Sequence, residues 1–300
     1  MTYKTCLVIA GPTAVGKTAL AVAVAQALGT EILSADSRQC YRGMAIGTAQ
    51  PTAGERALVP HHFVDCFSVT EGLNAGFYEG YGLRILDEIF RKKDVAVVVG
   101  GTGLYIKALL EGLDEMPPVI PEIAAAVEAG YKENGPDWLR EQLLEQDPKT
   151  FSAIDNRNPA RLLRALSFYR STGKNLVDFR KNTPVERPFR VVKIALDLPR
   201  PVLYDRIHQR VDAMMENGLL EEVKAMLPYR DLRPLQTVGY SELFRYLDGE
   251  WTLEEAVEKI KQHTRNYAKR QLTWFRNAGG YEWISAERPD AVAQVVAKLR

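Results

Sequence analysis

The sequence predicts an α/β protein, with a doubly wound parallel sheet around a phosphate-binding loop (P-loop) and an inserted all-helical domain. Short apolar segments alternate with helical ones over residues 4–110, as in parallel sheets covered by helices. The pattern G-x-x-x-x-G-K-[ST] stands between the first strand and the first helix, which is the context that a P-loop requires. A helical stretch flanked by prolines then interrupts the alternation before a strand resumes it.

The expected elements follow from apolar runs, helical periodicity and glycine or proline breaks. Strands are expected at residues 4–10, 31–35, 63–67, 94–99 and 190–196. Helices are expected at residues 17–28, 77–93, 104–110, 200–217, 219–227, 241–247 and 252–277. Residues 36–60 are rich in glycine and proline and are expected to form a long functional loop.

The helical stretch divides the chain into two expected domains. Residues 115–188 show helical patterns and no good strand, and prolines mark both ends of the stretch. We therefore expect a P-loop catalytic core of residues 1–114 and 189–300, and a helical insertion domain of residues 115–188.

Composition narrows the function class only slightly. The formal net charge is +1, so any nucleic-acid surface must come from local clusters of charge. The three cysteines (Cys6, Cys40 and Cys66) stand at unrelated spacings without a C-x-x-C pair, which argues against disulfides and structural zinc. The apolar run at residues 6–10 is too short for a signal peptide or a membrane span. We expect a cytoplasmic protein.

The P-loop is the strongest chemical signal. Its glycines let successive backbone N–H groups point into one concavity, Lys17 adds a charge, and the following helix offers its positive end. Thr18 is the expected magnesium ligand, so Mg²⁺ is the expected cofactor. The residues expected to hold a phosphate chain are Gly11, Pro12, Thr13, Ala14, Val15, Gly16, Lys17 and Thr18.

A nucleotide hydrolase also needs an acidic residue at the end of a buried strand, and the obvious strand in this sequence lacks one. The strand at residues 94–99 runs instead into the turn GGTG, residues 100–103. Asp36, at the carboxyl end of the preceding strand, fits a magnesium ligand or a general base, and a turn cap is the alternative. The Thr102 hydroxyl fits a substrate contact, although a tight strand-to-helix turn explains the glycines equally well.

Two stretches without acidic residues concentrate positive charge. In residues 156–177, three arginines share a helix face; residues 259–281 interleave six basic residues with Tyr267, Trp274 and Phe275. Such a mixture suits an RNA surface with stacking platforms, and the alternative is a solvated helix face with its aromatics in the core. Arg206 and Arg210, one helical turn apart, fit either a lid over phosphates or salt bridges to nearby carboxylates. His61 and His62 are expected to pack or to form hydrogen bonds.

Together, these motifs resemble the tRNA dimethylallyltransferases (tRNA isopentenyltransferases) over most of the chain. The matching segments are GPTAVGKT, SADSRQCYRGMAIGTAQP, HHFVD, VVVGGTGLYIKALLEG, NPARLLRAL, RVDAMMENGLLEEV, TVGYSE and TRNYAKRQLTWFR. The resemblance implies transfer of a dimethylallyl group from dimethylallyl diphosphate to the exocyclic amine of the adenosine 3′ of the tRNA anticodon. It also implies assistance by magnesium and release of pyrophosphate. No cysteine and histidine pairs for a C-terminal zinc finger are present, so the resemblance is to the bacterial type.

The resemblance also implies roles for single residues. The P-loop would hold the diphosphate of the donor, Asp36 would act as the base, and Arg210 and Thr18 would assist at the diphosphate. The helical insertion would grip the anticodon stem-loop, and Arg38 receives no individual role. The expected RNA contacts, including those from the basic stretches, are Asp36, Ser37, Arg38, Gln39, Thr102, Ala160, Arg161, Leu162, Leu163, Arg164, Arg270 and Trp274.

Three alternatives share parts of this pattern. An ATP-dependent P-loop kinase of small molecules would use the same loop, sheet and lid arginines. An isopentenyltransferase of free adenylate would share the donor site but has less need of the insertion. An RNA-binding switch would bind nucleotide and RNA and modify neither. We expect a monomer without a membrane partner, and binding of ATP stays open.

Overall fold

The computed structural model describes residues 4–181 and 183–299, which form two compact units. The core unit comprises the chain up to Glu111 and from Glu186 onward, and the insertion unit is Gly112–Val185. The expected insertion of residues 115–188 thus starts three residues later and ends three residues later than the observed unit. Within the described ranges, none of the helices has the length and apolarity needed to cross a membrane.

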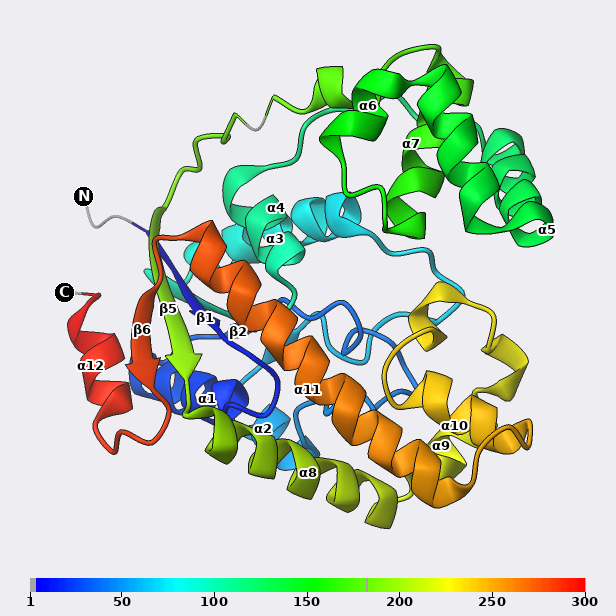
Figure 1. Cartoon of the computed structure of the whole chain (residues 1–300). Helices are drawn as coiled ribbons and strands as arrows, with labels where there is room; N and C mark the ends of the chain where they lie inside the picture. The colour runs from blue at the N-terminus through cyan, green and yellow to red at the C-terminus, as the bar shows by residue number, and fades with distance from the viewer. Residues whose placement is uncertain (1–3, 182, 300) are drawn as a thin grey trace. The chain divides into compact units, whose positions relative to one another are not determined.

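The core unit is built on a six-stranded parallel sheet with the order β3-β2-β4-β1-β5-β6. Figure 1 labels four of these strands, β1, β2, β5 and β6. The strands are β1 (Thr5–Ala10), β2 (Ile32–Ser34), β3 (His61–His62), β4 (Val95–Gly100), β5 (Arg190–Asp197) and β6 (Glu282–Ser285). Ala10, the last residue of β1, pairs with Gly100 on one side and with Ala195 on the other. The carboxyl ends of the central strands therefore meet at one edge, where ligands bind in open α/β sheets.

Helices cover both faces of this sheet, as a doubly wound fold requires. The helices of the core unit are α1 (Lys17–Leu28), α2 (Ala53–Leu58), α3 (Ala75–Phe90), α4 (Gly103–Glu111), α8 (Arg200–Glu216), α9 (Leu219–Ala225), α10 (Tyr240–Leu247), α11 (Leu253–Ala278) and α12 (Ala291–Ala297). Residues of β1 alternate between two buried clusters: Val8 belongs to the cluster that includes residues of α3, α4 and α10, whereas Ile9 belongs to the one that includes residues of α1, α8 and α12. This alternation follows from the two-residue period of a strand.

The prediction of a strand at residues 63–67 is wrong. Phe63 and Asp65 have φ angles of 61° and 52°, in the left-handed region that no strand contains. Strand pairing ends before them, and Phe67 makes only an isolated bridge with Tyr41. The sequence analysis also missed β6, α2 and α12, which are all short. The capping box between Thr52 and Glu55 shows why α2 starts inside a loop-like stretch.

The insertion unit is helical, with its own hydrophobic core. Its helices are α5 (Pro121–Gln146), α6 (Pro148–Ala153), α7 (Pro159–Thr172) and the 3₁₀ helix η1 (Leu176–Phe179). A kink at Gly135, which has a φ of 82° and precedes Pro136, divides α5. Both segments of α5 face α7, because Val127, Leu139 and Leu143 share a buried cluster with Leu166.

Candidate functional site

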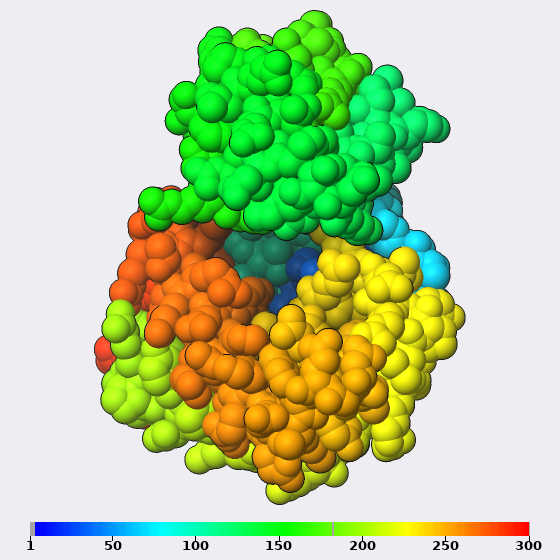
Figure 2. All heavy atoms as spheres, turned by 45° about the vertical axis from the view of Figure 1, so that its right-hand side comes forward, coloured from blue at the N-terminus to red at the C-terminus, as the bar shows by residue number. Residues whose placement is uncertain are grey.

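A cavity of about 300 Å³ lies at the carboxyl edge of the sheet in the core unit, and we call it the site pocket. Figure 2 shows the hollow in the core unit between α11, in orange, and the yellow segment before it, with blue N-terminal atoms at its bottom. The walls of the site pocket include Thr13, Gly16, Lys17, Thr18, Asp36, Arg38, Gln39, Gly100, Arg210, Tyr267 and Gln271.

The P-loop runs between β1 and α1 and takes a shape that suits an anion. Gly11, Ala14 and Gly16 have positive φ angles of 143°, 64° and 102°. A Cβ atom on Gly11 would lie 2.8 Å from the carbonyl oxygen of Leu196, so only glycine fits there. Helix α1 has no side-chain cap and no acidic residue in its first turn. Its N–H groups and its positive end are therefore available to a bound anion.

Two basic side chains stand beside the P-loop. The Lys17 ammonium donates to the Pro12 carbonyl oxygen at 2.7 Å, and the Arg210 guanidinium lies 3.5 Å from the Thr13 hydroxyl. Burial, with Arg210 nearby, lowers the pKa of Lys17 to about 7, although Asp36 opposes the shift. Burial also lowers the pKa of Arg210. Neither basic group forms an ion pair with any of the described residues, and two such neighbouring groups suit a strong anion.

The sequence left open whether Arg206 and Arg210 form salt bridges to carboxylates of their own helix. Among the described residues, neither forms an ion pair; Arg206 instead lies 3.5 Å from the Val15 carbonyl oxygen. Arg206 and Arg210 of α8 therefore both reach the P-loop, which fits the lid interpretation better than the salt-bridge one.

Asp36 follows β2 and faces the same pocket. Its Oδ1 accepts hydrogen bonds from the backbone N–H groups of Arg38, at 2.9 Å, and Gln39, at 3.3 Å. This is the Asx turn that the sequence analysis offered as the alternative role. In the described part of the chain, Oδ2 accepts no hydrogen bond. The Asp36 carboxylate thus holds the turn through one oxygen, and its residue also lines the site pocket.

Gln39 is already paired within the protein. Its amide nitrogen donates to the carbonyl oxygens of Thr48, at 3.2 Å, and Ala49, at 2.8 Å. Its amide oxygen accepts from the Ser34 hydroxyl at 3.3 Å. Gln39, one of the expected RNA contacts, therefore holds the loop at residues 44–50 in this structure.

The GGTG turn packs tightly against the loop of Asp36. The Thr102 hydroxyl accepts a hydrogen bond from the Ser37 N–H at 3.0 Å and donates to the Ser37 hydroxyl at 3.4 Å. A Cβ atom on Gly100 would lie 2.2 Å from the Ala35 carbonyl oxygen. Because β2 and β4 are neighbours in the sheet, their two loops form one continuous wall.

Gln271 of α11 connects this wall to the P-loop, and the sequence analysis missed it. Its amide oxygen accepts from the Thr13 N–H at 2.8 Å, and its amide nitrogen donates to the Gly101 carbonyl oxygen at 3.0 Å. The side chain is only 6% exposed. A polar residue on the buried face of an amphipathic helix, between Ala268 and Phe275, was the signal that could have identified it.

Glu222 of α9 is a second residue that sequence reasoning missed. Its two carboxylate oxygens accept from the N–H groups of Ile46 and Gly47, both at 2.8 Å. The Tyr240 hydroxyl donates to the same carboxylate at 2.5 Å, and burial raises the pKa of that phenol. This carboxylate fixes the loop that Gln39 holds from the other side.

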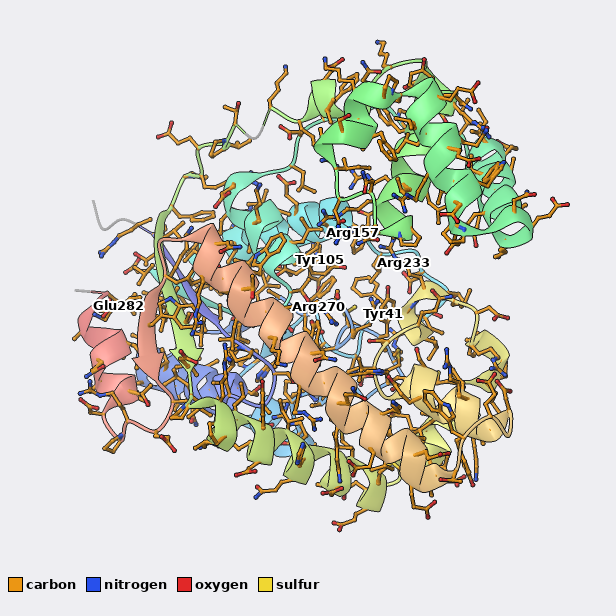
Figure 3. All side chains as sticks on the ribbon, in the orientation of Figure 1. Tyr41, Tyr105, Arg157, Arg233, Arg270 and Glu282 are labelled. Carbon is orange, nitrogen blue, oxygen red and sulfur yellow. The ribbon has the colours of Figure 1, made fainter. Side chains whose placement is uncertain are left out.

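Part of the basic stretch on α11 is already paired with carboxylates of the protein and is not available to RNA. Lys261 pairs with Asp212 at 2.9 Å and Arg276 with Asp197 at 3.2 Å, so carboxylates distant in sequence neutralise part of it. Phe275 is fully buried, which contradicts the stacking role suggested for the aromatics as a group. Trp274 is 42% exposed. Arg270, which is labelled in Figure 3, lies over the Tyr267 ring, with 5.6 Å between its guanidinium carbon and the ring centroid.

In the insertion unit, the predicted contacts divide by helix face. Ala160, Arg161 and Arg164 on α7 are exposed, whereas Leu162 is 1% exposed and lies in the hydrophobic cluster of the unit. The Leu162 side chain therefore packs inside the insertion unit, and contact of this residue with RNA stays a prediction. Leu163 is half-buried against the same cluster. The helical period of 3.6 residues turns these leucines inward when the arginines face solvent.

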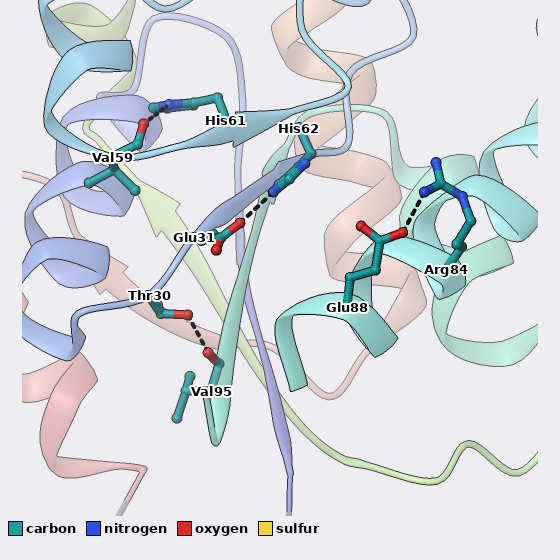
Figure 4. A network of polar contacts seen from close by, with 8 residues as sticks. All are labelled: Thr30, Glu31, Val59, His61, His62, Arg84, Glu88 and Val95. Atoms are coloured by element: carbon teal, nitrogen blue, oxygen red, sulfur yellow. Dashed lines mark hydrogen bonds and ion pairs between the residues drawn. The ribbon is translucent and has the colours of Figure 1, made fainter. Parts of the chain in front are cut away.

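The two histidines form hydrogen bonds, as the sequence analysis expected (Figure 4). Nδ1 of His61 lies 2.8 Å from the Val59 carbonyl oxygen, and Nε2 of His62 lies 2.7 Å from the Glu31 carboxylate. Burial lowers the pKa of His61. Within the described residues, no group of three or more histidine, cysteine or acidic side chains could hold a metal.

Comparison with known proteins identifies the family. The model of the family "IPP transferase" matches residues 39–278, which is more than half of the chain. The chain belongs to the IPP transferase family. It is 46% identical to a protein of Cytophaga hutchinsonii named tRNA dimethylallyltransferase, over 99% of this chain and 98% of that one. Membership decides against the small-molecule kinase alternative.

Solved structures of IPP transferases have the same fold. The tRNA isopentenylpyrophosphate transferase of Bacillus halodurans is 37% identical, with a TM-score of 0.72 over 99% of this chain and 94% of that one. A eukaryotic dimethylallyltransferase, solved acting on tRNA, is 27% identical, with a TM-score of 0.77 over 98% of this chain and 77% of that one. The predicted α/β P-loop fold is thus confirmed for this member of the family.

Proposed function

We propose that this chain transfers a dimethylallyl group from dimethylallyl diphosphate to the exocyclic amine of the adenosine 3′ of the anticodon in tRNA. The observation that carries the proposal is the pairing of two walls in one pocket. One wall holds the P-loop, Lys17 and Arg210, and the other presents the free oxygen of Asp36. Named tRNA dimethylallyltransferases with 40–46% identity over nearly the whole chain support this choice of reaction.

The P-loop wall suits a diphosphate that leaves rather than a nucleotide that is hydrolysed. In the reaction, the bond between the allylic carbon and the diphosphate oxygen breaks, and negative charge accumulates on that oxygen. Backbone N–H groups, Lys17 and Arg210 surround the place where this charge would develop. This role needs no acidic residue after β4, which explains why GGTG stands there.

The donor set in the site pocket fits the magnesium that the P-loop implies. Mg²⁺ commonly binds one or two protein oxygens together with substrate phosphates and waters. The Thr18 hydroxyl lines the site pocket at the start of α1, with the Asp36 carboxylate in the same pocket. Thr18 would hold the ion, which would neutralise part of the diphosphate charge.

Asp36 acts on the acceptor in this proposal. The lone pair of the adenine amine is delocalised into the ring, so the amine becomes a better nucleophile as its proton is removed. The new bond joins this nitrogen to the allylic carbon, and the proton passes to Oδ2 of Asp36. The target base must leave its stack to reach the pocket. Exposed Arg161, Arg164, Arg270 and Trp274 are suited to contact the RNA around it.

A direct assay of transfer tests the proposal. The protein is incubated with magnesium, an unmodified anticodon stem-loop and dimethylallyl diphosphate, and the digested RNA is analysed by nucleoside mass. We expect one prenylated adenosine per stem-loop, and no product when ATP replaces the donor. Free AMP serves as a second acceptor. Prenylation of AMP without prenylation of RNA would overturn the proposal in favour of an adenylate isopentenyltransferase.

A further inference from the structure

A second cavity of about 640 Å³ lies in the core unit between α4 and α11, and we call it the α4–α11 pocket. Its apolar floor includes Ile106 and Leu110, which are 1% and 6% exposed. Arg270, Trp274 and Ala278 line it from successive turns of α11. Neither the proposed chemistry nor the P-loop makes use of this cavity.

Trp274 forms a rigid aromatic wall of the α4–α11 pocket. A Cβ atom on Gly103 would lie 1.9 Å from the indole nitrogen of Trp274, so the indole rests directly on the glycine backbone. The side chain is nevertheless 42% exposed. A large aromatic group that is held firmly and left open on one face is suited to stack against a planar ligand.

Positive charge surrounds this apolar floor. Lys107, Lys193, Lys269 and Arg270 line the pocket, together with a single carboxylate, that of Glu111. Glu111 lies 3.7 Å from Lys193, so it offsets at most part of this charge. An apolar floor, an aromatic wall and a basic rim are complementary to a nucleobase with its phosphodiester.

The GGTG turn separates the two cavities. Gly100 lines the site pocket, and Gly103 lines the α4–α11 pocket. On α11, Gln271 faces the first pocket, whereas its neighbour Arg270 faces the second. Three residues of backbone span at most about 11 Å, which is a distance that one nucleotide step of a splayed strand can bridge.

We infer that the α4–α11 pocket receives the nucleobase next to the target adenosine in the RNA strand, with that base stacked on Trp274. The inference rests on the proposed function, because it takes the site pocket as the place of the target base. The strand crosses the GGTG turn, and the two adjoining bases enter separate cavities. Splaying the bases apart exposes the target amine and checks the identity of its neighbour in one step.

Binding measurements test this inference without depending on catalysis. Dissociation constants are measured for wild type and Trp274→Ala with three stem-loops: a complete one and two that lack the base 5′ or 3′ of the target. In wild type, we expect loss of one of these bases to weaken binding about 5- to 100-fold, the range for stacking on an aromatic side chain. Trp274→Ala should weaken binding of the complete stem-loop by a similar factor.

The combination of both changes is decisive, since two groups that contact each other are not additive. Trp274→Ala should cause no further loss with the stem-loop that lacks the matching base, and Trp274→Phe should restore most of the affinity. Additive losses for both abasic stem-loops would overturn the inference. The matched control is Tyr229→Ala, which removes a side chain of similar exposure, 40%, outside both pockets and should leave affinity unchanged.

A filling variant guards against misfolding of the Trp274 variants. Ala278→Trp places a large side chain in the cavity from the exposed end of α11. This variant should bind the complete stem-loop about as weakly as wild type binds the matching abasic stem-loop. Unchanged affinity in this variant would also overturn the inference. Failure of the proposed function would give a different result. Wild type would then bind the complete stem-loop with this base dependence but form no prenylated adenosine. No binding of that stem-loop by wild type contradicts both.

Discussion

The two walls of the site pocket differ in how far their polar and charged groups already have partners within the protein. On the P-loop wall, Lys17 and Arg210 are held close together with lowered pKa values, and α1 lacks a side-chain cap. On the opposite wall, Oδ1 of Asp36 and the side chain of Gln39 are bonded to the protein backbone. The first wall stays electrostatically incomplete until an anion binds, whereas the second is already organised. Changes to the first should therefore affect binding, and changes to the second should affect the chemical step.

Asp36→Asn should give the largest effect. Asparagine keeps an oxygen that accepts from the N–H groups of Arg38 and Gln39, so the turn survives, while the proton acceptor is lost. We expect kcat to fall about 10²- to 10⁴-fold, with the affinities for pyrophosphate and stem-loop RNA within about threefold of wild type. Single-turnover rates and binding titrations check both parts. Asp36→Ala also breaks the turn and serves for comparison, and a wild-type rate in Asp36→Asn would refute the role of base.

Lys17→Met should give the second-largest effect, and this effect should concern the use of dimethylallyl diphosphate. Losing a buried donor to the diphosphate is expected to lower kcat/KM for dimethylallyl diphosphate about 10²- to 10³-fold, with RNA affinity unchanged. Calorimetric titration with pyrophosphate shows whether the loss lies in binding. Lys92→Met, an exposed lysine, is the matched control. A pyrophosphate affinity that survives in Lys17→Met would contradict the division between the walls.

Gln271→Leu should affect both donor binding and the chemical step, because Gln271 forms hydrogen bonds with both walls. The change leaves the Thr13 N–H and the Gly101 carbonyl oxygen without their partner, at a cost of about 1–3 kcal/mol for each buried group. We expect lower stability in urea and a moderate fall, about 10-fold, in both donor affinity and kcat. Gln271→Glu keeps the acceptor for Thr13 but places a negative charge beside the anion site, so it should bind the donor more weakly than Gln271→Leu does. Equal donor affinities in the two variants would count against this positioning role.

The pH dependence of donor binding should give the smallest effect. The pKa of Lys17 is lowered to about 7 in the folded protein, against about 10.4 in an unfolded chain. The unfolded state thus binds more protons between these values, so this residue makes stability rise with pH across that window. An anion favours charged Lys17, so pyrophosphate affinity should fall about fivefold from pH 7 to pH 8. Titrations without magnesium measure it, and Lys17→Met should lack this component.

The features that depend on local sequence were predictable. The P-loop and the position of Asp36 after a strand follow from short motifs and from the rule that parallel strands end at one edge. The contact of Arg210 with the P-loop did not, because the sequence left both a lid and salt bridges open. The roles of Gln271 and Glu222 were not predictable, because their partners lie 258 and 176 residues away in the chain. The burial of the Leu162 side chain was not evident from the contiguous motif, because the helical period of α7 turns part of that motif into the core. Residues 63–67 failed as a strand because backbone dihedral angles, not hydrophobicity, decide there.

The hydrogen bond between Gln271 and Thr13 has a consequence for the order in which the protein is made. The ribosome releases the P-loop early, and Gln271 follows 258 residues later, which takes roughly 13 to 50 seconds at 5–20 residues per second. During that interval, the nascent chain carries a phosphate-binding motif without the side chain that fixes its first turn. An unfinished chain therefore lacks this contact, and under the proposed function it would become competent to bind the diphosphate only near the end of translation.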